Sequence, residues 1–108
     1  MFTAAQAIAK LDLALAKAGE DVSVHSVTAG VPDAGVTVRA AVRGFEPDEL
    51  TGDIRQNDRK VILSPTGLTV EPIKGRKIKI AGKTYNIEHA EPFRMGATVV
   101  RYECQVRG

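Results

Sequence analysis

The fold is decided by the stretch Gly75-Arg-Lys-Ile-Lys-Ile-Ala-Gly-Lys-Thr-Tyr-Asn-Ile-Glu88. Apolar side chains occupy every second position on both sides of a turn, at Ile78, Ile80, Tyr85 and Ile87. Only a β-strand places alternate residues on one face. Gly82 is suited to the positive φ of a tight reversal. We therefore predict a β-hairpin over about residues 76–90, with its turn at Gly82-Lys83.

The same alternation extends away from the hairpin in both directions. After a turn at Met95-Gly96, a last strand is expected at about 98–106. Its core-facing side chains are Val100, Tyr102, Cys104 and Val106. Earlier strands are expected at 22–27, 36–43 and 60–64, and residues 28–35 read as a turn or mobile loop.

The chain begins with a predicted helix over about 3–18. Thr3 and Gln6 have the spacing of a capping box, and the segment is rich in alanine, which favours helix. Gly19 is expected to end the helix in a left-handed conformation. One helix followed by five or six antiparallel strands closes best as a small β-barrel or sandwich, in a single domain of residues 1–108.

The composition argues against several classes of function. The net charge is only +2, and Cys104 is the single cysteine, expected to be a buried bystander thiol. The two histidines lie far from it without zinc-site spacing, so no catalytic, metal or cofactor site is expected. No apolar run approaches the ~20 residues of a membrane span, and no secretion signal is recognised.

Basic residues crowd the predicted hairpin, where they leave two interpretations open. One is an ordinary solvated strand face. The other is a surface that contacts DNA phosphates, for which the candidate side chains are Arg76, Lys77, Lys79 and Lys83.

A long connection at 44–58 exceeds the usual loop length, and such loops are commonly functional. It ends in the polar run Gln56-Asn57-Asp58-Arg59-Lys60. This run is either an ordinary turn or a set of hydrogen-bonding and charged groups that cross-link neighbouring subunits. In the second case an apolar anchor such as Phe45, Leu50 or Ile54 has to contribute, because exposed ion pairs alone add little affinity.

The order of these motifs resembles a known family. A Gly-x-x-Pro-x-Glu-Leu loop precedes Ile-Arg-Gln-Asn-Asp-Arg-Lys-Val, and Ile-x-Ile-x-Gly-Lys-x-Tyr-x-Ile follows Gly75. Gly96 and a terminal Tyr-x-x-Gln-Val-Arg complete the pattern. Over about residues 36–108 the chain resembles the head–tail joining proteins of tailed bacteriophages, also called head-completion or stopper proteins, which occur in prophages and gene-transfer particles too.

The resemblance implies a small barrel without enzymatic activity that assembles as a ring, commonly a hexamer. It implies a place in the virion neck, after synthesis in the host cytoplasm. Its partners would be the portal and adaptor on the head side, a tail-terminator protein on the tail side and packaged double-stranded DNA, with no membrane involved.

The resemblance also implies a role for the loop at 44–58, which would close the channel or contact the next subunit. The residues expected in that role are Phe45, Glu46, Asp48, Glu49, Leu50, Gln56, Asp58 and Arg59. The residues expected to face outward on the last strand are Arg101, Gln105 and Arg107.

Two alternatives stay open at this point. The first is another neck or tail ring protein, such as a tail terminator. The second is a small β-barrel module that binds nucleic acid through the basic hairpin.

Overall fold

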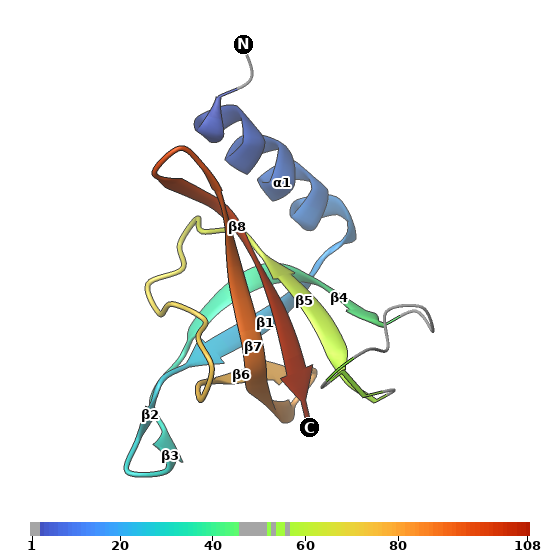
Figure 1. Ribbon diagram of the computed structural model, residues 1–108, viewed down its shortest axis with the longest axis vertical. Coiled ribbons are helices and arrows are strands. Elements are labelled where there is room, and N and C mark those ends of the chain that lie inside the picture. Colours follow the sequence, from blue (N-terminus) through green and yellow to red (C-terminus); the bar gives the residue numbers. More distant parts are fainter. Residues whose placement is uncertain (1–2, 46–51, 53, 56) are drawn as a thin grey trace.

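The computed structural model describes residues 3–45, 52, 54, 55 and 57–108. Its centre is a closed antiparallel barrel with the strand order β1-β4-β5-β8-β7-β6, in which β6 pairs back onto β1 (Figure 1). The predicted antiparallel barrel with an N-terminal helix is confirmed, and closure of the sheet excludes the sandwich. The elements are α1 (Ala4–Ala18), β1 (Glu20–His25), β2 (Val27–Thr28), β3 (Val31–Pro32), β4 (Val36–Gly44), β5 (Arg59–Leu63), β6 (Lys77–Ile80), β7 (Lys83–Met95) and β8 (Thr98–Arg107).

The core lies inside the barrel and follows the predicted alternation. Successive strand residues point to opposite sides of the barrel wall, so each strand contributes every second side chain to the interior. The buried apolar side chains that pack together are Val22, Val24, Ala40, Val61, Leu63, Ile78, Ile80, Ile87, Cys104 and Val106. All of them are aliphatic or small, which suits the narrow interior of a six-stranded barrel.

The deciding hairpin forms with a turn one residue earlier than expected. Ile80 pairs with Lys83, so the two loop residues are Ala81 and Gly82, and both have positive φ, 50° and 82°. Positive φ at both central residues is the geometry that matches the twist of the flanking strands. Lys83 therefore begins β7 and is not part of the turn.

Helix α1 lies across one end of the barrel and packs on β4 and β8 (Figure 1). The capping box is present: Thr3 Oγ1 accepts from the Gln6 N–H, and Gln6 Oε1 accepts from the Thr3 N–H. The expected left-handed cap at Gly19 is wrong, because this residue is extended (φ −88°, ψ −178°). Glycine is needed there for space, since a Cβ would lie 2.5 Å from the Leu15 carbonyl oxygen.

The carbonyl groups at the end of α1 are satisfied by a side chain of the barrel. Arg39 on β4 donates from Nε to the Leu15 carbonyl at 3.2 Å and from NH2 to the Gly19 carbonyl at 2.7 Å. A cation at this end also complements the helix dipole. Leu15, the one buried residue of the helix, is thereby held against the barrel.

Two hairpins extend from the barrel. Residues expected as a turn or mobile loop instead contain the two-stranded sheet of β2 and β3, fixed by the Asp33 carboxylate, which accepts from the hydroxyls of Ser26 and Thr28. At the other end, β7 and β8 continue past the barrel as a long antiparallel pair toward α1 (Figure 1).

Candidate functional site: the base of the 44–58 loop

The loop at 44–58 begins and ends at one point of the barrel wall. Its flanking strands β4 and β5 pair with each other up to Gly44, which lies opposite Arg59. The whole segment is therefore an insertion at the end of a regular hairpin. The position of its two ends is set by barrel register and not by the loop itself.

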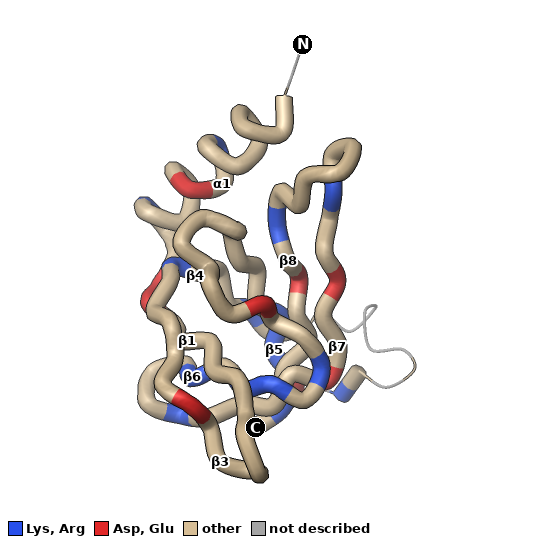
Figure 2. The backbone as a smooth tube through the Cα atoms, turned by 90° about the vertical axis from the view of Figure 1, so that its left-hand side faces the viewer, with Lys and Arg blue, Asp and Glu red and all other residues tan. Residues whose placement is uncertain are grey.

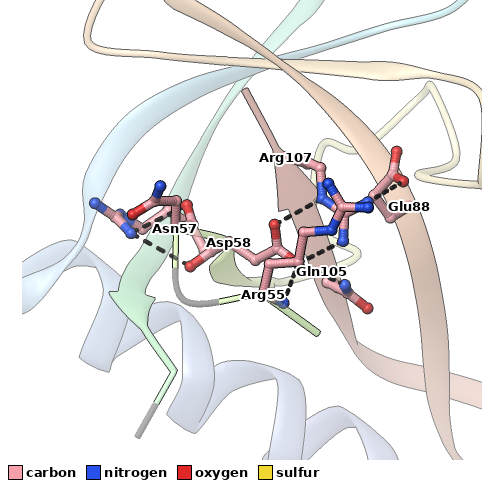
Figure 3. A network of polar contacts seen from close by, with 7 residues as sticks. Arg55, Asn57, Asp58, Glu88, Gln105 and Arg107 are labelled. Atoms are coloured by element: carbon pink, nitrogen blue, oxygen red, sulfur yellow. Dashed lines mark hydrogen bonds and ion pairs between the residues drawn. The ribbon is translucent and has the colours of Figure 1, made fainter. Parts of the chain in front are cut away.

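Asp58 fixes the second end of the loop. Its side chain is fully buried, with 0% exposure, and both carboxylate oxygens accept hydrogen bonds (Figure 3). Oδ1 accepts from Arg107 Nε at 2.9 Å. Oδ2 accepts from Arg107 NH2 at 3.0 Å, from Gln105 Nε2 at 2.8 Å and from the Arg55 backbone N–H at 2.9 Å. The two-point contact with the planar guanidinium gives the pair a defined geometry.

These contacts decide the protonation state of the carboxylate. The Arg107 hydrogen bonds, with those from Arg55 and Gln105, lower the pKa of Asp58 to about 2, against the opposing effect of burial. Asp58 is therefore ionised at neutral pH, and it neutralises the positive charge that Arg107 brings to this part of the wall.

The outer side of β8 carries a continuous row of such contacts. Arg107 NH1 also donates to Glu88 Oε1 at 3.0 Å. Further along the strand, Glu103 pairs with Lys60 at 3.1 Å and with Arg101 at 2.8 Å, and the Arg101 guanidinium lies 4.5 Å from the centre of the Phe93 ring. The base of the loop thus rests on a row of paired side chains from β5, β7 and β8.

A groove runs beside this row. It has a volume of about 540 Å³ and lies between the end of the loop, the segment before β6, and strands β7 and β8. Its charged and titratable lining residues are Arg55, Lys74, Glu88, His89 and Arg107. A smaller cavity of about 160 Å³ next to it is lined in part by Phe45 and Ile54. Both apolar residues are half-buried, so this edge of the loop packs on its own barrel.

The residues expected in the channel loop fall into two groups. Glu46, Asp48, Glu49, Leu50 and Gln56 lie outside the described residues, so their expected role stays a prediction. Within the described chain, Phe45 is half-buried, and Arg59 donates to the carbonyl oxygens of Asn57 and Asp58 at 3.2 and 3.3 Å.

Asp58 lies at the end of the loop, and its side chain makes contacts within its own subunit. Its carboxylate lies inside its own subunit with both oxygens occupied, so it is not available to a neighbouring one. Gln105 and Arg107 lie on the outer side of the wall, as alternation predicts, and both are half-buried because they contact Asp58. Only Arg101 of the three outward candidates is exposed.

The four basic candidates for DNA contact do not form one cluster. Lys77 and Lys79 lie on the outer side of β6, where they alternate with buried Ile78 and Ile80. Lys83 pairs with Ile80 and so lies on the opposite side of the wall, with Nζ 5.0 Å from the Tyr85 ring. The Arg76 guanidinium donates to the Glu71 carbonyl at 2.6 Å.

The network around Asp58 is the feature that sequence reasoning missed. Asp58 and Arg107 are 49 residues apart, and no local pattern links them. The sequence gives only a weak signal for this contact: an aspartate immediately before one strand, and an arginine at an outward-facing position of the last strand.

Cys104 is buried, as expected. Burial raises the pKa of its thiol to about 12, and the nearby Glu103 carboxylate adds to the effect. Among the described residues, no group of three or more His, Cys, Asp or Glu side chains is placed to hold a metal ion. Nor does that part of the chain contain a helix long and apolar enough to cross a membrane.

Comparison with protein-family models found none that matches the chain, and comparison with curated proteins found no match either. The function is therefore inferred from the motif order of the sequence together with the side chains and topology described above.

Proposed function

We propose that this chain is a ring-forming structural protein of the neck of a tailed phage-like particle, a head-completion or stopper protein. In this role it lies between the portal–adaptor complex and the tail, retains packaged DNA and offers the tail a docking surface. The motif order described in the sequence is the origin of the proposal. The barrel is compatible with it, because a ring subunit needs a rigid body and not a flexible one.

The observation that supports the proposal best is the way the 44–58 loop is attached. Gly44 and Arg59 pair directly, and buried Asp58 ties the end of the loop to β8. A segment that is to reach into a channel, or onto a neighbouring subunit, needs a base that does not move when the segment does. The Asp58–Arg107 contact supplies such a base.

The two ends of the barrel also differ, which suits a ring whose two rims meet different partners. One end carries α1 and the tip of the β7–β8 pair, and the other carries the β2–β3 hairpin and the C-terminus (Figure 1). A subunit with two such different ends can present one to the head and the other to the tail.

The proposal is tested in a bacterium that produces the particles, by deleting the gene for this chain. We expect DNA-filled heads without tails, which lose their DNA during purification, and restoration of joined particles by the intact gene. Tailed, infectious particles formed without the chain would contradict the proposal.

The role of the loop is tested separately by replacing residues 46–51 with glycine and serine at unchanged length, which leaves Asp58 in place. We expect this variant to enter the particles and join tails, and the particles to lose DNA faster than wild type. The matched control replaces Thr69 and Glu71, exposed residues of the segment before β6, with serine and should retain DNA as wild type does. Normal DNA retention by the loop variant would show that the loop is not the closing element.

A further inference from the structure

The outer side of the barrel at β1, β6 and β7 carries two polar rows. The register places Thr37, Ser23, Lys79 and Thr84 opposite one another on β4, β1, β6 and β7. The next row consists of His25, Lys77, Asn86 and Arg107, on β1, β6, β7 and β8. Directly opposed residues share one side of a sheet. We call these two rows the basic face (Figure 2 shows blue segments along β6, which runs through its middle).

The positive charge of this face is not neutralised locally. Among the residues that the structure describes, no carboxylate pairs with Lys77 or Lys79, and Lys77 donates to the Asn86 side-chain oxygen. At the edges of the face, by contrast, the charges are balanced. Arg107 contacts Asp58 and Glu88, and Asp21 lies 3.4 Å from Arg39. The two lysines in the centre therefore carry the net charge.

More cations lie beyond Arg107. The groove that begins there is lined by Lys74 and Arg55, both exposed. Within the described chain, neither side chain forms an ion pair. Together with the two lysines of the face they make a belt of four positive charges around this part of the barrel. Strands are spaced by roughly 4.8 Å, so a row of four strands spans about 14 Å. That width can contact more than one phosphate of a nucleic-acid backbone.

The residues between the cations favour one ligand over others. Hydroxyl and amide groups beside lysines are typical donors to phosphate oxygens, and such contacts carry no sequence information. The two rows contain no Phe, Tyr or Trp side chain on which a base could stack, and the ring of His25 is held by Ser23 Oγ and the Asp33 carbonyl, which disfavours single-stranded ligands. They also contain no large apolar side chain, which disfavours insertion into a lipid surface.

We infer that the basic face binds the sugar–phosphate backbone of double-stranded DNA without reading its sequence. The inference rests on the proposed function only for identifying that DNA as the packaged genome. Lys77 and Lys79 make the central contacts, the neighbouring Thr84 and Asn86 side chains add hydrogen bonds, and Lys74 and Arg55 extend the footprint.

The test uses the purified full-length protein and a labelled 20-base-pair duplex, with binding followed by fluorescence anisotropy between 20 and 200 mM NaCl. Each neutralised phosphate contributes about −0.9 to the slope of log K against log salt, so four cations predict a slope between roughly −2 and −4. We expect the same affinity for two duplexes of unrelated sequence. The variant Lys77→Gln/Lys79→Gln should weaken binding at low salt by at least about tenfold and reduce the slope by about 2.

The matched control is Lys10→Gln/Lys17→Gln on α1, which removes the same charge elsewhere. It should keep the wild-type slope, and all variants should keep the wild-type melting temperature. An equal loss in both double variants would mean that only net charge matters and would overturn the inference. So would the absence of binding at 20 mM NaCl, tighter binding to a single strand, or binding to anionic vesicles without binding to DNA.

The DNA-binding experiment can fail or succeed independently of the proposed role in the phage neck. If the chain binds duplex DNA through Lys77 and Lys79 but is absent from particles, the proposed function fails and the basic face stands. If particles depend on the chain but neither lysine affects its DNA affinity, the basic face is wrong and the neck role is unaffected.

Discussion

At the scale of single residues, Asp58 is the side chain on which the base of the loop depends. A buried carboxylate is costly unless its charge and its hydrogen-bonding capacity are satisfied. Here one arginine, one amide and one backbone N–H satisfy it. Removing one partner of such a buried pair usually destabilises a protein by several kcal/mol, because the other charge is left without compensation.

The lowered pKa of Asp58 predicts how the stability of the protein depends on pH. The folded-state pKa is about 2, below the ordinary value of 3.8, so the unfolded chain takes up the proton first as the pH falls. The contribution is complete above about pH 4 and is lost as the pH falls toward 2. It amounts to about 2 kcal/mol in the free energy of unfolding. Urea denaturation from pH 2 to pH 6 measures it.

The variant Asp58→Asn should be less stable at pH 6 and should lose less stability on acidification than wild type. Glu91→Gln, which changes an exposed carboxylate on β7, serves as the control and should follow the wild-type profile. A wild-type profile in Asp58→Asn would mean that Asp58 is not the group that titrates.

At the scale of secondary-structure elements, the hairpin of β6 and β7 contains a local strain. Ala81 has a φ of 50°, in the left-handed region that alanine adopts only at a cost. The adjacent Gly82 meets the same requirement without cost. The barrel register forces this conformation, since Ile80 must lie opposite Lys83.

Replacing Ala81 with asparagine should stabilise the protein, because Asn-Gly is the preferred pair for a turn with two positive φ values. We expect a gain on the order of 1 kcal/mol, or roughly 4 °C in melting temperature by calorimetry. Gly82→Ala is the opposite change and should lower the melting temperature by a similar amount. A loss of stability in Ala81→Asn would show that the alanine makes a contact that compensates its backbone strain.

The elements themselves were largely predictable, and the exceptions have identifiable causes. Alternation and the capping box defined the helix and the barrel strands, because those patterns depend on neighbours two to four residues away. The turn at Ala81 was misplaced by one residue because alanine carries no turn signal. Gly19 was assigned the wrong conformation because its glycine is needed for contact with the Leu15 carbonyl, which sequence does not reveal.

The candidate site was less predictable than the fold for the same reason. Asp58, Gln105 and Arg107 meet only because β5 and β8 are neighbours in the closed sheet. The clustering of basic residues in sequence was also misleading. Strand alternation separates Lys83 from Lys77 and Lys79, although all four basic candidates lie within one hairpin.

At the scale of the whole molecule, closure of the sheet makes the barrel independent of the inserted loop. Every strand of the barrel has two neighbours, and the pairing of β4 with β5 runs up to Gly44 and Arg59, the two ends of the inserted loop. We therefore expect the same-length glycine and serine replacement of 46–51 to keep the unfolding transition cooperative, with a melting temperature within about 3 °C of wild type. Thermal unfolding followed by circular dichroism measures it.

A matched deletion tests whether the barrel depends on its strands, as closure of the sheet requires. Removing residues 101–108 takes away the part of β8 that lies between β5 and β7, so this variant should not fold. A large drop in melting temperature in the loop replacement would mean that the loop takes part in the core and is not a separable insertion.

The direct pairing of Gly44 with Arg59 has a consequence for engineering. Both ends of the insertion meet at a single ladder position, so the segment between them can be exchanged for an unrelated peptide of different length while the strands stay in register. If copies of the chain encircle a common axis, each would carry one such graft. The molecule would then be a scaffold for multivalent display, in which the spacing of the grafts follows from symmetry.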